Sequence, residues 1–241
     1  MSLLIDADYI VYKCCAATEK DLDFGEDIIV VISDFADCYN MVLRELATIA
    51  ENLGVFDDSI LFFSDYKNFR KKLAPDYKGH RNRKKPCGYK RVINKLHEDF
   101  QVIRMPNMEA DDAIGIYATA NPGNIIVSPD KDMRQIPGEL YDMKDAVSTI
   151  TPEEGLRWHY IQTMAGDATD GYSGIPGIGV KRADAILTNE GCSWETVVKA
   201  FAAKDLDESV ALLNARLAKI LQVENYDNGE IRLWLPTPTS N

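Results

Sequence analysis

The chain has 241 residues, 46% of them hydrophobic, and a formal net charge of −11. This length is enough to bury a full core, either as one large domain or as a domain with a smaller appendage. No apolar run approaches the roughly 20 residues that span a bilayer, and the opening MSLLIDADYIVY lacks the basic start and cleavage site of a signal peptide. Five cysteines without Cys-x-x-Cys spacing favour reduced thiols. We therefore expect a cytoplasmic monomer without membrane contact.

The acidic net charge conceals a basic segment over residues 67–95. This segment contains 12 Lys and Arg against the single acid Asp76, a net of +11, so the remaining 15 basic and 37 acidic residues carry −22. A basic cluster often only solvates a surface. This one follows Asp65 directly and contains Tyr77 and Tyr89, whose rings can stack on bases. The pattern favours a polyanion-binding element beside an acidic site.

Short apolar runs predict the first strands of an α/β fold. We expect strands over residues 3–12, 60–63, 101–104 and 124–127, and either a strand or a helix approach over 28–32. Helical spacing of apolar residues predicts helices up to Gly54, over 92–100 and over 109–120. Ser33 is the expected N-cap of the first of these helices. Residues 67–90, punctuated by Pro and Gly, are predicted as a loop or short-helix excursion.

Strands that alternate with helices indicate a mainly parallel sheet. Ligands bind outside the carboxyl ends of such strands, where Asp6, Asp65 and Asp130 would converge. From Thr151 onward the pattern is helical, and residues 229–235 read as a final strand. We therefore expect an α/β core over 1–150 and a helical part over 151–241, packed together as one unit.

Ten carboxylates recur in short clusters where strands or helices should end. They are Asp6, Asp8, Asp65, Glu109, Asp111, Asp112, Asp130, Asp132, Asp167 and Asp170. Such groups repel one another unless cations neutralise them, and oxygen ligands in this number suit Mg²⁺ or Mn²⁺. A pair of these ions commonly serves phosphodiester cleavage. Taken singly, the 109–112 cluster also fits an ordinary helix first turn, and the 130–132 cluster fits a surface turn.

The stretch GDATDGYSGIPGIGVKRA over 166–183 combines a glycine-rich turn with the start of a helix. Such a turn, here with Gly174, Gly177 and Gly179, exposes backbone N–H groups to a phosphate. Lys181 and Arg182 supply positive charge beside it. The alternative is a tight packing joint between two helices.

Taken together, the motifs resemble the flap-endonuclease superfamily of 5′ nucleases, most closely the 5′→3′ exonucleases of T-seven-type bacteriophages. The resemblance rests on FSDYKNFRKKLAPDYKGHR, KKPCGY, EADD, SPDKD, GDATDGYSGIPGIG and EIRLWLP, which span nearly the whole chain. It implies a PIN-like α/β core, a short basic arch over about 67–90, and a helix–three-turn–helix element around GIPGIG. It also implies K⁺ at that turn.

The same resemblance implies roles for individual residues. Asp65, Glu109, Asp111 and Asp130 would hold or support the catalytic metal, Asp132, Asp167 and Asp170 the second, and Asp6 and Asp112 would complete the shell. Lys78 would contact the scissile phosphate, and Arg81 would stabilise transition-state charge. The expected DNA contacts are Tyr77, Arg83, Lys84, Lys85, Gly174, Gly177, Gly179, Lys181 and Arg182.

These roles predict a Mg²⁺-dependent 5′→3′ exodeoxyribonuclease acting on duplex ends or nicks, in the host cytoplasm if the gene is viral. Mn²⁺ is the expected substitute, and short flaps and RNA–DNA hybrids are further candidate substrates. The short arch, interrupted by Pro86 and Gly88, argues against threading of long flaps. Two alternatives stay open: a haloacid-dehalogenase-like phosphatase with Asp6 as nucleophile, the first Asp of an Asp-x-Asp expected on one strand face, or a non-catalytic DNA-junction binding protein.

Overall fold

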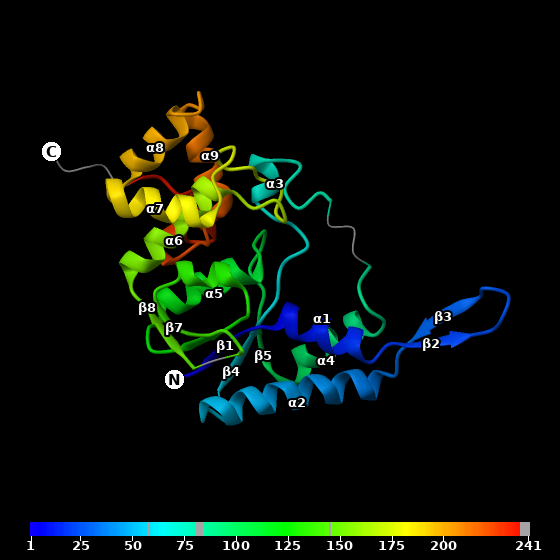
Figure 1. Cartoon of the computed structure of the whole chain (residues 1–241). Coiled ribbons are helices and arrows are strands. Elements are labelled where there is room, and N and C mark those ends of the chain that lie inside the picture. The colour runs from blue at the N-terminus through cyan, green and yellow to red at the C-terminus, as the bar shows by residue number, and fades with distance from the viewer. Residues whose placement is uncertain (57, 81–83, 145, 237–241) are drawn as a thin grey trace.

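The computed structural model describes residues 1–56, 58–80, 84–144 and 146–236, and its central element is a six-stranded sheet (Figure 1). The strand order is β5-β4-β1-β6-β7-β8. The bounds are β1 Leu3–Asp6, β4 Ser59–Phe62, β5 Gln101–Ile103, β6 Ile125–Val127, β7 Gly138–Tyr141 and β8 Ser148–Ile150. All neighbours pair in parallel except β7 and β8. The predicted α/β class with a mainly parallel sheet is confirmed.

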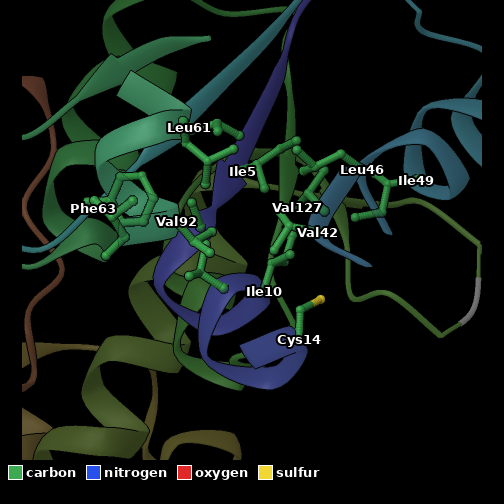
Figure 2. Close-up of a cluster of buried hydrophobic side chains, with 14 of the residues drawn as sticks. Ile5, Ile10, Cys14, Val42, Leu46, Ile49, Leu61, Phe63, Val92 and Val127 are labelled. Atoms are coloured by element: carbon green, nitrogen blue, oxygen red, sulfur yellow. The ribbon is translucent and has the colours of Figure 1, made fainter. Parts of the chain in front are cut away.

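Helices cover both faces of this sheet. On β1, Leu3 and Ile5 enter one hydrophobic cluster and Leu4 enters another, because successive side chains of a strand point to opposite faces. The first cluster, partly drawn in Figure 2, is closed by α1 (Ala7–Ala17), α2 (Phe35–Leu53) and α4 (Tyr89–Asp99). The second is closed mainly by α5 (Ala110–Ala120). Among the described residues, no helix combines the length and apolarity that a bilayer crossing requires.

The first strand is shorter than the predicted 3–12. It ends at Asp6, and α1 begins at Ala7 with Ile10, Cys14 and their neighbours buried at helical spacing. The predicted strand is wrong beyond Asp6. A short run of apolar residues such as IDADYIVY does not distinguish a strand from a helix that buries one face against a sheet. Asp8 therefore lies in the first turn of a helix, and the expectation that it shares a strand face with Asp6 is wrong.

The region between α1 and α2 is a β-hairpin. Strand β2 (Lys20–Asp23), which was not predicted, pairs antiparallel with β3 (Ile29–Ile32), so the run at 28–32 is a strand and not a helix approach. All eight of their residues are exposed, and the hairpin projects from the body in Figure 1. The N-cap of α2 is Asp34, whose carboxylate accepts from Ala36 N, and not Ser33. The predicted stop at Gly54 is confirmed by its left-handed backbone, φ +67°.

The C-terminal part is built mainly from four helices. They are α6 Pro152–Ala165, α7 Val180–Glu190, α8 Trp194–Ala202 and α9 Glu208–Ala218. Thr151 and Glu154 form the capping box that starts α6, as predicted. The final strand is shorter than 229–235, since β10 (Glu230–Ile231) pairs only with β9 (Tyr226–Asp227). Gln135 donates to Ala218 O at 2.7 Å, which joins this part to the core, while the division at residue 150 stays a prediction.

A buried ion pair locks α5 to the chain that follows α9. Arg70, in the short helix α3 (Arg70–Leu73), is 3% exposed and bonds both oxygens of the fully buried Asp112 at 2.7 and 2.8 Å. The same guanidinium donates to Leu217 O, and Leu221 N donates to Asp112. The N–H groups of the Arg70 guanidinium and both oxygens of Asp112 all have hydrogen-bond partners. Buried charges are tolerated when they are satisfied in this way.

We predict that Arg70→Ala lowers the free energy of unfolding by about 3–5 kcal/mol, because Asp112 is left charged and buried without its partner. Urea unfolding followed by circular dichroism measures this. The matched control is Arg157→Ala, whose partner Asp184 is half exposed and whose loss should cost about 1 kcal/mol or less. Equal losses in the two variants would contradict the role given to the buried pair.

Candidate active site

The carboxyl edge of the parallel sheet opens into a pocket of about 1200 Å³. Nine of the ten predicted carboxylates line it: Asp6, Asp8, Asp65, Glu109, Asp111, Asp130, Asp132, Asp167 and Asp170. They arrive from the ends of β1, β4 and β6, from the start of α5, and from the turn before α7. The convergence predicted from parallel-strand topology is therefore present, and it includes residues far apart in the chain.

One group of these carboxylates gathers around Asp6. Burial, followed by the charge of Asp8, raises the pKa of Asp6 to about 7, although Ser128 donates a hydrogen bond to it at 3.0 Å. Burial also raises the pKa of Asp111 well above its usual value, with the charges of Asp6 and Asp130 adding to the shift. These groups resist ionisation together, so a bound cation would relieve them.

A second group surrounds Asp132. Burial, followed by the charges of Asp130 and Asp167, raises the pKa of Asp132 to about 7. Its Oδ1 atom is buried and accepts no hydrogen bond from the described part of the chain. The charge of Asp130 raises the pKa of Asp6, Asp111 and Asp132 alike, so it acts on both groups.

Lys78 neutralises part of this acidity from within the pocket. Its ammonium forms an ion pair with Glu109 and lies 3.5 Å from Asp170. Burial by itself would lower the pKa of Lys78, but these carboxylates raise it above its ordinary value. Burial would likewise raise the pKa of Glu109, yet Lys78 and Arg70 bring it down to about 2. Glu109 is thus held as a carboxylate, whereas no cation among the described residues forms an ion pair with Asp6 or Asp132.

The donor set fits hard divalent cations. The pocket offers carboxylate oxygens, the ligands that Mg²⁺ and Mn²⁺ take, and one of them is the orphaned oxygen of Asp132. Within the described ranges, no three His, Cys, Asp or Glu side chains stand close enough to form a ready-made cation cage. Cation binding would therefore draw these side chains together from their present positions.

Two tyrosines of the basic segment do not have the predicted role. Tyr77 is 2% exposed, and its hydroxyl donates to Glu109 and Asp170, both at 3.0 Å. Tyr89 is also buried, and its hydroxyl donates to Asp8 at 2.9 Å. Neither ring is free to stack on a base, so the expectation of stacking is wrong. Both side chains instead hold carboxylates of the pocket.

Asp112 is the one predicted ligand that does not reach the pocket. Both of its oxygens are engaged by Arg70, and one of them also caps α5 through Glu109 N. Asp65 does line the pocket, and its hydrogen bond from Asn107 N at 2.7 Å lowers its pKa. Arg81 and Arg83 lie outside the described residues. Lys84 is exposed beside the pocket, and Lys85 lines it.

The glycine turn before α7 combines packing with exposure. A Cβ on Gly174 would lie 2.4 Å from Gly166 N, so this glycine is required by close packing. Gly177, at φ +76°, and Gly179 are exposed, and a Cβ on either would meet no atom within 4 Å. Lys181 and Arg182 are exposed in the first turn of α7. The packing alternative therefore applies to Gly174, whereas phosphate contact at Gly177 and Gly179 stays a prediction.

A family model described as the 5′-3′ exonuclease N-terminal resolvase-like domain matches residues 1–160. The chain belongs to this 5′-3′ exonuclease family. It is 31% identical to the exodeoxyribonuclease of Enterobacteria phage T3 over 97% of this chain and 92% of that protein. It is also 31% identical to the exonuclease of Escherichia phage T7 over 97% and 93% of the two chains. As a family member it is a nuclease that acts on DNA, and the resemblance to phage exonucleases is confirmed.

Solved structures support the same fold. The T5 D15 protein co-crystallised with metal ions superposes with a TM-score of 0.64 at 14% identity, covering 90% of this chain and 88% of its own. The catalytic core of Rad2 in complex with a DNA substrate gives 0.55 at 12% identity, covering 85% and 64%. At such identities the likeness establishes architecture alone, a resolvase-like PIN-type sheet flanked by helices.

Sequence reasoning missed three residues that shape this family site. Ser128 donates to Asp6, and Ser64 N donates to Asp8 at 2.8 Å. Arg70 lines the pocket and supports Glu109 and Asp112. Ser64 and Ser128 each follow a predicted strand, so their positions contained a signal. Nothing in the local sequence distinguished Arg70 from the other cations of the basic segment.

The raised pKa of Asp132 predicts a pH-dependent stability difference. A carboxyl whose pKa rises to about 7 on folding stabilises the fold most below about pH 4, and this contribution is lost as pH rises through about 7. In metal-free buffer at pH 8, Asp132→Asn should therefore melt a few degrees above the wild type, and the gap should shrink towards pH 5. Thermal melts in a chelator measure this, with the exposed Asp21→Asn as control. A gap that is constant with pH would contradict the electrostatic origin.

Proposed function

We propose that this chain is a divalent-metal-dependent 5′→3′ exodeoxyribonuclease that hydrolyses phosphodiesters at duplex ends or nicks. The observation that carries the proposal is the pair of carboxylate groups around Asp6 and Asp132, which share Asp130 within one pocket. The basic segment lies at the same pocket through Lys78 and Lys85, so a polyanion can be held where the acids gather. Family membership makes DNA the substrate class.

The residues divide into two candidate ligand sets. Asp65, Glu109, Asp111 and Asp130, with Asp6, would hold one ion, and Asp132, Asp167 and Asp170 would hold the second. Two such ions, Mg²⁺ or Mn²⁺, supply a nucleophilic hydroxide and neutralise charge on the attacked phosphate. Asp112 leaves the predicted ligand set, because Arg70 occupies its oxygens.

Lys78 is the cation placed to act on the scissile phosphate. Its ammonium already lies among the carboxylates, and its backbone N–H donates to Asp170 O at 2.8 Å, which fixes its position. A phosphate entering the pocket would compete with Glu109 for this ammonium, and the charge developing in the transition state would strengthen the interaction. Arg81 is proposed to add charge beside it.

Duplex binding is assigned to the surface on either side of the acids. Lys84, Lys85 and Arg83 belong to the basic segment, and Lys181 and Arg182 follow the glycine turn. The open backbone at Gly177 and Gly179 lets a phosphate approach closely, and we assign the K⁺ to this turn. A monomer acting on duplex ends, nicks or short flaps, and on RNA–DNA hybrids, is the proposed working form in the cytoplasm of its host.

The alternative functions account for less of the pocket. A phosphatase with Asp6 as nucleophile would leave the acids around Asp132 and the basic segment without a purpose. A binding protein without catalysis would not require Asp6 and Asp132 to remain acids that other carboxylates repel. The deciding experiment incubates 5′- and 3′-labelled duplex, nicked, flap and RNA–DNA substrates with and without Mg²⁺. Release of label from the 5′ end only with metal supports the proposal, and no release from any substrate would refute it.

Asp132→Asn should abolish cleavage, lowering the single-turnover rate by at least about 100-fold, because a neutral amide is a poor ligand for Mg²⁺. The variant should still fold, as its unchanged circular dichroism would show. Near-normal turnover of Asp132→Asn in Mg²⁺ would overturn the assignment of two ions.

Lys78→Ala should separate chemistry from binding among the basic residues. We expect its single-turnover rate at saturating protein to fall about 100-fold, because the scissile phosphate loses its nearest ammonium. The exposed Lys84→Ala is the matched control and should weaken duplex binding and its salt dependence while sparing that rate. Equal losses of affinity alone in both variants would remove Lys78 from the chemistry.

Gly179→Val tests the glycine turn. The backbone at Gly179 has φ −98° and open space at its Cβ, so valine should fold normally while it blocks a phosphate from the backbone. We expect weaker duplex binding, and the advantage of K⁺ over Na⁺ at equal ionic strength should disappear. Gly174→Ala is the contrasting variant, and its main loss should be thermal stability, because its Cβ overlaps Gly166. Normal, K⁺-sensitive binding by Gly179→Val would place the duplex elsewhere.

A further inference from the structure

The basic segment is attached to the acidic pocket at both of its ends. At the first end, the Tyr77 hydroxyl donates to Glu109 and Asp170. At the second end, where the segment enters α4, the Tyr89 hydroxyl donates to Asp8. The first attachment involves residues already assigned to metal and phosphate. The second involves a carboxylate and a tyrosine for which the proposed reaction provides no role.

Both oxygens of Asp8 accept hydrogen bonds from other elements of the fold. Oδ2 accepts from Ser64 N at 2.8 Å, at the end of β4, and Oδ1 accepts from the Tyr89 hydroxyl at 2.9 Å. Both oxygens therefore serve to join α1, β4 and α4. The charge of Asp8 also repels that of Asp6, so its presence has an electrostatic cost that the two hydrogen bonds must offset.

The ring of Tyr89, which its hydrogen bond to Asp8 restrains, contacts the ammonium of Lys85. The Lys85 ammonium lies 4.5 Å from the centroid of the Tyr89 ring and 5.7 Å from that of Tyr12, and the two rings meet edge to face. Lys85 lines the pocket, whereas its neighbour Lys84 does not. A tyrosine fixed by its hydroxyl thus forms the surface over which this ammonium is held.

A backbone contact supports the same end of the segment. Cys87 N donates to the Glu19 carboxylate at 2.7 Å, and the thiol of Cys87 lies 3.6 Å from Val31 O. Cys87, which follows Lys85 and Pro86, is thereby anchored beside the base of the hairpin formed by β2 and β3. Because the chain is already restrained there, we expect the hydrogen bond from Tyr89 to orient the Lys85 side chain more than it stabilises the fold.

We propose that Asp8 and Tyr89 are positioning residues, whose hydrogen bond orients Lys85 over the acidic pocket to take a backbone phosphate of the DNA strand. This inference rests on the proposed nuclease function. It assigns Asp8 to the placement of a DNA-binding cation and separates it from the carboxylates that would hold metal. The two residues act through Lys85, so their effect belongs to binding and not to bond cleavage.

The test measures duplex binding at several salt concentrations, in a chelator so that no cleavage occurs. Tyr89→Phe keeps the ring and removes only the hydroxyl. We expect it to weaken binding about fivefold and to reduce the slope of log Kd against log salt by up to one unit, as loss of one phosphate contact would. Asp8→Ala should produce the same change, because it removes the carboxylate that accepts from the tyrosine hydroxyl.

Combined variants decide whether these residues act through Lys85. In a Lys85→Ala background, Tyr89→Phe and Asp8→Ala should cause no further loss of binding, since coupled residues are not additive. The control is Tyr39→Phe, which removes a similar tyrosine hydroxyl bonded to Asp99 and outside the pocket residues. It should bind as the wild type does. With Mg²⁺ present, the single-turnover rate of Tyr89→Phe at saturating protein should stay within about twofold of the wild-type rate.

Several results would overturn the inference. They are wild-type binding by Tyr89→Phe, additive losses in the Lys85→Ala background, or a neutral Asp8→Ala beside a damaging Tyr89→Phe. A fall in melting temperature with an unchanged salt slope would make the pair purely structural and would also overturn it. Absence of cleavage by the wild type would instead refute the nuclease proposal, and the binding measurements would still decide the role of Asp8 and Tyr89.

Discussion

Mutual repulsion of carboxylates at the carboxyl edge of a parallel sheet is the constraint on which the rest of this structure depends. The protein neutralises part of it with its own cations, Lys78 beside Glu109 and Arg70 beside Asp112. Among the described residues it gives Asp6 and Asp132 no such ion pair, and burial together with neighbouring carboxylates raises their pKa values to about 7. A bound cation would relieve this repulsion.

Acids that are paired with a cation of the protein differ in role from acids that are not. Glu109 is kept ionised by Lys78, whereas Asp112 is fixed in a buried pair with Arg70. Asp8 accepts hydrogen bonds from two other elements, so it joins them. Asp65 also accepts two hydrogen bonds, from Tyr66 N and Asn107 N, and yet it lines the pocket. The count of carboxylates in the sequence overstates the candidate ligands because Asp112 lies outside the pocket.

The aromatic residues of the basic segment have a different role from the one that composition predicts. Tyrosines among lysines and arginines predict base stacking, yet Tyr77 and Tyr89 are buried and their hydroxyls bond carboxylates. Their rings instead lie near ammonium groups, Lys78 at 5.2 Å from the Tyr77 centroid and Lys85 at 4.5 Å from that of Tyr89. The segment is integrated into the active site and does not simply cover it.

The sequence by itself determined the strand–helix alternation, the convergence of Asp6, Asp65 and Asp130, and the helix signals at Gly54 and Thr151, because these follow from local periodicity and capping chemistry. Only the tertiary structure decided that Asp8 lies on a helix, that Arg70 and not another cation is buried with Asp112, and that residues 20–32 form an exposed hairpin. Those outcomes depend on contacts between residues far apart in the chain, such as Arg70 with Leu217 O. Local pattern contains no information about which partner such a side chain will meet.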